Sequence, residues 1–100
     1  MTMNVDQEFF NEVLRHLDII YEVDDDTKLK IQDLINDGKA VLEFKAQNND
    51  IDWEDSFNKR ILKEYVRFSY NGLTDFFDDN FITAITEFCI RNEVYENGKV

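Results

Sequence analysis

The chain has 100 residues, close to the usual size of a single domain. Its 22 acidic and 11 basic residues give a formal net charge of −11, which disfavours direct binding to nucleic acid or anionic lipid. A need for solubility is enough to explain such a charge. Two functional roles are also compatible with it: a protein that surrounds DNA without binding it tightly, and a protein that mimics DNA. No apolar run approaches the roughly 20 residues of a membrane span, and no secretory signal is visible, so we expect no membrane partner.

The first predicted helix covers residues 5–20, VDQEFFNEVLRHLDII. Its apolar residues recur at helical spacing and form one stripe that runs from Val5 to Ile20. Asp6 and Glu8 lie near the positive end of the helix dipole, where acidic side chains are favourable. The segment therefore predicts an amphipathic helix that buries one face.

The second predicted helix runs from about residue 27 to 47, and the acidic run at 24–26 supplies its N-terminal cap. Gly38 falls on its apolar stripe, although glycine in a helix costs about 1 kcal/mol relative to alanine. A glycine on the buried face lets another helix approach closely, so we expect close helix packing at Gly38. A functional kink is the alternative.

An acidic loop with turn-forming residues follows at 48–55. Asp52 or Asp55 can cap the next helix, and Trp53 and Phe57, four residues apart, can meet across its first turn. The loop also resembles a calcium-binding loop in part. It lacks the glycine and the final glutamate that such a loop needs, so we interpret its acids as helix caps.

The third predicted helix covers residues 57–73, and a last helix begins near Phe81. Gly72 falls on the apolar side of the third helix, where we expect close packing as at Gly38; a bend is the alternative. No strand pattern or repeat competes. The sequence therefore predicts an all-α fold, a small bundle of about four antiparallel helices in a single domain of residues 1–100, with a polar tail from about residue 92.

No catalytic, cofactor-binding or metal-binding motif is visible, so we expect no enzyme, no cofactor and no metal. His16 is the only histidine and Cys89 the only cysteine, too few ligands for a usual zinc site. Cys89 lies on the apolar stripe of the last helix, which favours a small core residue over a nucleophile. No second titratable residue stands at a sequence spacing that would pair it with His16, which favours a surface or rim position for this histidine over a role as a base.

Four basic residues on the third helix form one positive stripe on a negative chain: Lys59, Arg60, Lys63 and Arg67. A solvated face that pairs with nearby acids such as Glu64 explains the stripe. The sharper hypothesis is a subunit interface that contacts the acidic face of a neighbouring copy. A protein with unlike faces can assemble head to tail into a ring.

The order of these features resembles the small head–tail connector (adaptor, or DNA-packaging) proteins of tailed bacteriophages. The likeness runs from about Phe9 to Phe88. It depends on Lys39-Ala40 after Gly38, on the aromatic-rich stretch 65–70, and on Asn71-Gly72 leading into Phe76, Phe77 and Phe81. These are packing patterns and not catalytic motifs.

The resemblance implies a non-enzymatic virion component that forms a homo-oligomeric ring beneath the portal protein and docks a head-completion or tail protein. It would sit in the virion neck, and in the bacterial host cytoplasm during assembly. The ring would extend the DNA channel, through which DNA passes without specific binding, and the polar tail from Asn92 is a candidate for portal docking. Alternatives are a small acidic DNA-mimic inhibitor of a DNA-binding protein, for which charge and size speak, and a regulatory or antitoxin-like helical protein.

Overall fold

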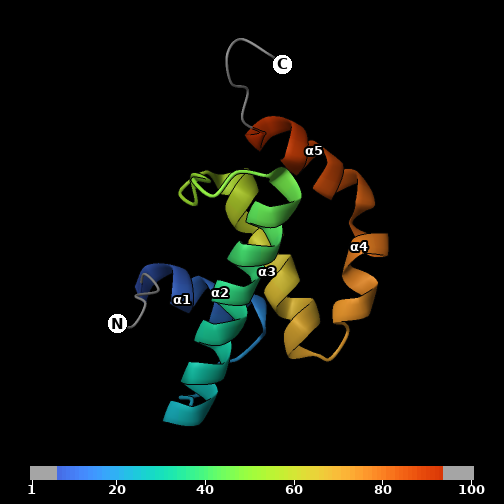
Figure 1. Ribbon diagram of the computed structural model, residues 1–100. Helices are drawn as coiled ribbons and strands as arrows, with labels where there is room; N and C mark the ends of the chain where they lie inside the picture. The colour runs from blue at the N-terminus through green and yellow to red at the C-terminus, as the bar shows by residue number, and fades with distance from the viewer. Residues whose placement is uncertain (1–6, 94–100) are drawn as a thin grey trace.

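The computed structural model describes residues 7–93, and all regular structure in that range is helical (Figure 1). The predicted all-α class, a small helical bundle, is confirmed. Four longer helices are joined in chain order by short loops, with one short 3₁₀ turn and one single-turn helix before the last: α1 (Gln7–His16), α2 (Asp25–Ala46), α3 (Ser56–Tyr70), η1 (Thr74–Phe76), α4 (Phe77–Asn80) and α5 (Ile82–Asn92).

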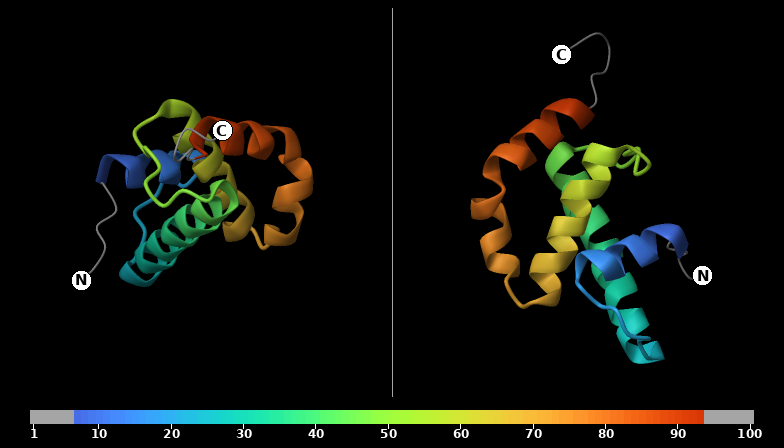
Figure 2. Two further views of the ribbon diagram at one scale, coloured as in Figure 1. Left: turned by 45° about the horizontal axis from the view of Figure 1, so that its top comes forward. Right: turned by 180° about the vertical axis from the view of Figure 1, so that it is seen from behind.

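The long helices α2 and α3 form the centre of the fold and run in opposite directions. Helix α1 lies on one side of this pair, and the curved segment of α4 and α5 lies on the other (Figure 2). Helix α1 packs on α3, whereas α5 contacts both α2 and α3. Buried apolar side chains from all four longer helices make one continuous core.

Gly38 lies buried where α2 meets α3. A Cβ atom at this position would lie 2.7 Å from Cδ1 of Leu62 and 2.8 Å from Cδ1 of Tyr65. Carbon atoms pack best at about 3.5–4.0 Å, so a side chain here would overlap with the Leu62 and Tyr65 side chains unless they or the helices shifted. The glycine therefore allows the close helix contact that its place on the apolar stripe predicts.

Gly72 has a different role, and the prediction of close packing at this residue is wrong. It is exposed, nothing lies within 4 Å of where its Cβ would be, and its φ is +75°. Helix α3 ends at Tyr70 and does not continue to residue 73. The left-handed conformation of Gly72 turns the chain, so the alternative of a bend describes it.

The first helix is also shorter than its apolar pattern predicts. Helix α1 ends at His16, and Asp18 adopts a left-handed φ of 61° that turns the chain away from the helix axis. Ile20 consequently leaves the apolar stripe and is 95% exposed, while Ile19 is buried in its place. The prediction of a buried Ile20 is therefore wrong.

The loop before α3 bears on two predictions made from the sequence, the N-cap of the helix and the contact between Trp53 and Phe57. Asp55 is the N-cap of α3 and accepts a hydrogen bond from the Asn58 N–H at 3.1 Å, as one of the two expected caps. Because the helix begins only at Ser56, Trp53 lies before it and does not have helical i, i+4 geometry with Phe57. Trp53 stacks instead on Phe88 of α5, with ring centroids 6.0 Å apart.

A cluster of aromatic rings attaches α4 to α3. The ring of Phe77 lies edge-on to Tyr65 at 5.2 Å, and the ring of Phe81 lies edge-on to Phe68 at the same centroid distance. Phe77 is almost fully buried, whereas Phe76 is 55% exposed because the 3₁₀ turn points it away from the cluster. Of the three phenylalanines that follow Gly72, Phe77 and Phe81 therefore join this cluster, whereas Phe76 does not.

A pair of asparagine side chains ties the end of α5 to the start of α3. Each amide of Asn58 and Asn92 donates to the other's oxygen, at 3.1 and 3.0 Å. The Asn58 amide also donates to the Asp52 carbonyl at 3.0 Å, and the Asn48 amide donates to the Asn92 carbonyl at 2.7 Å. Asn92 is therefore part of the fold, and the predicted polar tail begins after it; residues 94–100 lie outside the described residues.

Candidate functional site

The basic stripe on α3 is the candidate interface that the sequence singles out, and most of it is paired within the chain. Lys59 Nζ lies 3.6 Å from a carboxylate oxygen of Glu54, and Lys63 Nζ lies 3.4 Å from one of Glu12 on α1. Arg67 donates from Nε and Nη2 to one oxygen of Glu64, at 2.9 and 2.6 Å. These contacts fit the interpretation of a self-paired surface.

Arg60 is the exception in the stripe. Its side chain is exposed, and no ion pair joins it to another residue of the described range 7–93. The paired cations Lys59, Lys63 and Arg67 are partly exposed, with 23–42% of each side chain accessible, so water can solvate them when an interface displaces their present carboxylate partners. The stripe therefore keeps one free cation and several exchangeable ones.

Helix α1 meets this stripe through a contact that sequence reasoning missed. His16 Nε2 lies 3.1 Å from Oε2 of Glu64, the carboxylate that also accepts from Arg67. The two residues are 48 positions apart, so no local spacing indicates the pair. His16 is partly exposed, as its expected rim position requires, and Glu64 links α1 to the basic stripe.

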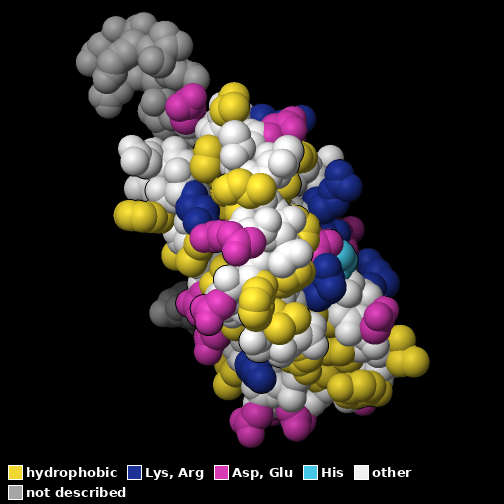
Figure 3. Space-filling model, turned by 90° about the vertical axis from the view of Figure 1, so that its right-hand side faces the viewer, with side chains coloured by type: hydrophobic (Ala, Val, Ile, Leu, Met, Phe, Trp, Pro, Cys, Tyr) yellow, Lys and Arg dark blue, Asp and Glu magenta, His cyan; other side chains and the backbone are white. Residues whose placement is uncertain are grey.

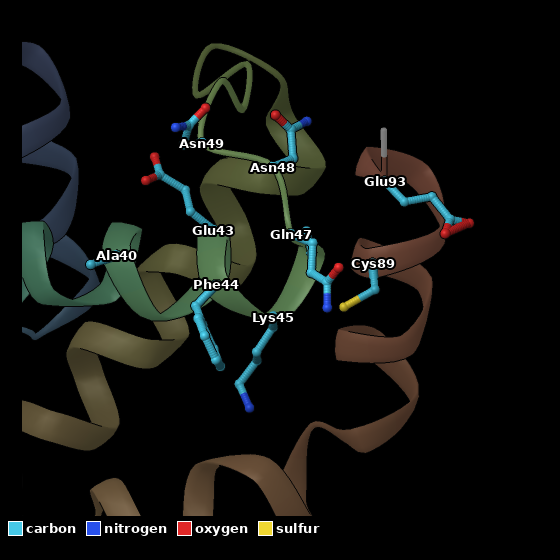
Figure 4. Close-up of a pocket in the computed structure, with 10 residues that line it drawn as sticks. Ala40, Glu43, Phe44, Lys45, Gln47, Asn48, Asn49, Cys89 and Glu93 are labelled. Atoms are coloured by element: carbon cyan, nitrogen blue, oxygen red, sulfur yellow. The ribbon is translucent and has the colours of Figure 1, made fainter. Parts of the chain in front are cut away.

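A second surface feature is a hollow of about 990 Å³ between the end of α2 and α5 (Figure 4). Ala40, Phe44, Gln47, Cys89 and Glu93 are among the residues that line it. Phe44, near the C-terminal end of α2, is a large apolar side chain that is 82% exposed. The hollow combines an apolar wall with a polar rim.

Cys89 packs against the core with one side and faces this hollow with the other. It is partly exposed, so it is less buried than the core position that the apolar stripe predicts. Partial burial raises the pKa of the thiol because the thiolate loses hydration, although Lys45 counteracts this effect. A thiol with a raised pKa is a weak nucleophile, so nothing here marks Cys89 as catalytic.

Further apolar side chains lie exposed at separate places on the surface. In the view that faces α4 and α5, hydrophobic side chains alternate with acidic ones and do not merge into one patch (Figure 3). The most exposed are Ile20, Tyr21, Leu29, Phe44, Phe76, Ile82 and Ile90. Isolated exposed apolar residues are normal, so these side chains do not by themselves indicate a binding surface.

The described residues contain neither a metal-binding cluster nor a membrane-spanning helix. Within residues 7–93, no three histidine, cysteine or acidic side chains gather where a metal ion would bind. None of the helices in that range combines the length and apolar character needed to cross a bilayer. The acids at 24–26 form the expected cap: Asp24 accepts from the Thr27 N–H at 2.8 Å, and this bond lowers the pKa of its carboxyl.

Comparisons with protein-family models, curated proteins and solved structures find no match to this chain. The likeness to phage connector proteins therefore stays a hypothesis based on helix order and packing pattern. Any function assigned to the chain depends on its own surface and charges.

Proposed function

We propose that the chain is a structural subunit of a bacteriophage head–tail connector, assembling as a ring under the portal protein. The ring extends the DNA channel and docks the next neck or tail protein. The resemblance in helix order, from the first amphipathic helix to the aromatic segment after α3, supports this proposal.

The observation that carries the proposal is the free Arg60 within the basic stripe of a chain with net charge −11. A closed ring requires two different surfaces that complement each other on neighbouring copies. The stripe on α3 is one such surface, and the acids that cover the rest of the chain offer the other. The three paired cations contribute only where an interface displaces their present partners.

The charge of the chain also fits passage of DNA through the ring. A negative channel wall repels the phosphate backbone, so the duplex slides without binding to it. The same charge accounts for the DNA-mimic alternative, but the cations on α3 would interrupt a phosphate-like array on that face.

Sedimentation velocity of the purified chain tests the ring contact. We expect concentration-dependent self-association that weakens as salt rises, because salt screens exposed charges beyond about 8–10 Å at physiological ionic strength. Arg60→Glu should abolish the association while far-ultraviolet circular dichroism stays unchanged.

Lys28→Glu is the matched control, since Lys28 is also an exposed cation and the change in formal charge is the same. It lies on α2, outside the stripe, and we expect it to leave assembly intact. Unchanged assembly of Arg60→Glu, or equal loss in both variants, would show that the stripe is not the contact.

A further inference from the structure

The long helix α2 has an exposed face that points away from α3. Gly38 marks the opposite, buried face, because a Cβ there would meet Leu62 and Tyr65 of α3. At 3.6 residues per turn, positions two, five and nine residues from Gly38 lie on the far side of the helix. The exposed residues at these positions, together with their neighbour Asp37, form the outer face of α2: Leu29, Asp33, Asn36, Asp37 and Ala40.

Two acidic side chains on this outer face have no partner within the described range 7–93. Asp33 and Asp37 are exposed, and no ion pair or hydrogen bond joins either carboxylate to another residue of that range. They lie four residues apart, so their like charges repel each other along the helix and destabilise it slightly. A cation supplied from outside the subunit would relieve this repulsion.

The basic stripe lies on the other side of the central helix pair. Arg60 points away from α2, because it lies two residues before Leu62, whose side chain is directed at Gly38. Helix α2 stands in front of α3 in Figure 1 and behind it in the rear view of Figure 2. One chain therefore presents unpaired acids on one side and an unpaired cation on the other, which is the arrangement that head-to-tail assembly needs.

We propose that the outer face of α2 receives the basic stripe of a neighbouring copy, with Asp33 and Asp37 set against the stripe's cations. The inference rests on the proposed function, for which it names the acidic half of the ring contact. On the stripe, Arg60 and Lys63 are three residues apart, and the two acids are four apart. Both spacings place the Cβ atoms of a helix about 5–6 Å apart, so the two pairs of charges match.

Several other acids are less suited to this role because they are engaged within their own chain. Glu12, Glu54 and Glu64 pair with cations of the stripe. Asp24 and Asp55 accept hydrogen bonds as helix caps. A neighbouring cation would have to displace these contacts, whereas Asp33 and Asp37 have no contact to lose within the described residues.

Charge reversal on each face, followed by mixing of the variants, tests the pairing by sedimentation velocity. Arg60→Glu alters the stripe, and the double variant Asp33→Lys/Asp37→Lys alters the outer face of α2. Each alone should self-associate at least about tenfold more weakly than the wild type, because like charges then oppose each other across the contact. An equimolar mixture should associate again, because the unaltered stripe of one variant meets the unaltered α2 face of the other.

The matched control is Asp75→Lys/Asp79→Lys, which makes the same change in formal charge at two exposed acids near α4. We expect it to leave self-association unchanged. An equal loss in the control and in the α2 variant would show that net charge, and not this face, governs association, and would overturn the inference. If the lysine variant loses its helical circular dichroism, Asp33→Asn/Asp37→Asn removes the charges at almost constant shape and should also weaken association.

Failure of the inference is distinguishable from failure of the proposed stripe contact. If Arg60→Glu abolishes self-association but neither α2 variant weakens it, the stripe contact stands and its acidic partner lies elsewhere, which overturns the inference. If the wild-type chain does not self-associate, or if Arg60→Glu has no effect, the stripe contact is itself wrong and the inference fails with it.

Discussion

Replacing Gly38 by alanine sets two effects of opposite sign against each other. Alanine stabilises a helix interior by about 1 kcal/mol relative to glycine. Its methyl group, however, would lie 2.7 and 2.8 Å from carbon atoms of Leu62 and Tyr65. Overpacking of this kind typically costs about 1–3 kcal/mol, so its size relative to the helix gain decides the outcome.

The neighbours of Gly38 have little room to yield. Leu62 is fully buried, and Tyr65 is 8% exposed with its ring held edge-on against Phe77. We therefore take the overpacking cost to lie near the middle of that range. After the helix gain is subtracted, Gly38→Ala should lower the free energy of unfolding by about 1 kcal/mol. In a domain of this size, that corresponds to a fall in Tm of roughly 4–8 °C.

Urea denaturation measures the effect, with Asn36→Ala as the control. Asn36 is exposed on the same helix, so alanine there should raise stability by about 0.5 kcal/mol through helix propensity alone. The double variant Gly38→Ala/Leu62→Ala should be more stable than the sum of its single effects predicts, by at least about 0.5 kcal/mol, because the methyl group enters the vacated space. A gain in stability for Gly38→Ala, equal to that of the control, would refute the close contact.

Other contacts give further expectations. Asn58→Ala should cost about 2–3 kcal/mol in urea denaturation, because the buried Asn58 amide is removed, the Asn92 side chain loses two hydrogen bonds and the Asp52 carbonyl loses one. A loss below about 0.5 kcal/mol, of the order of a surface change, would contradict the amide pair. The pKa of Asp24 is lowered in the folded state, so its contribution to stability is present above the unfolded-state pKa and is lost as pH falls through the folded-state pKa. Asp24→Asn keeps the cap oxygen but does not titrate, so it should lose stability less steeply than the wild type below about pH 4. If stability falls with pH equally steeply in the wild type and in Asp24→Asn, the titration of the Asp24 cap does not contribute to stability. Gly72→Ala should cost about 1 kcal/mol through its positive φ, and Gly72→Asn clearly less; equal losses would point to packing.

The features that the sequence predicts correctly are local or periodic. The cap at Asp24 follows from an acidic run before an apolar stripe, and the close packing at Gly38 follows from its position on that stripe. Both signals lie within one helix and do not depend on the rest of the fold.

The errors and omissions arise where distant residues or backbone conformation decide. The apolar pattern continues through Ile20, but the left-handed conformation of Asp18 ends the helix first. Aspartate adopts that conformation more readily than most residues, but one aspartate among many in this acidic chain does not single out the turn. The pairs His16–Glu64 and Asn58–Asn92 join positions 48 and 34 residues apart. A polar residue in a helix gives no sign of such a partner before the helices are placed in space.

The identity of the proteins that bind the chain in cells tests the proposed function most directly. The chain would be tagged and purified from its native host after phage induction or infection, and the proteins that accompany it would be identified by mass spectrometry. A connector subunit should bring down the portal protein and a head-completion or tail protein, and should do so less with Arg60→Glu than with Lys28→Glu. A host nuclease, polymerase or repressor without any virion protein would contradict the connector role and favour the DNA-mimic inhibitor.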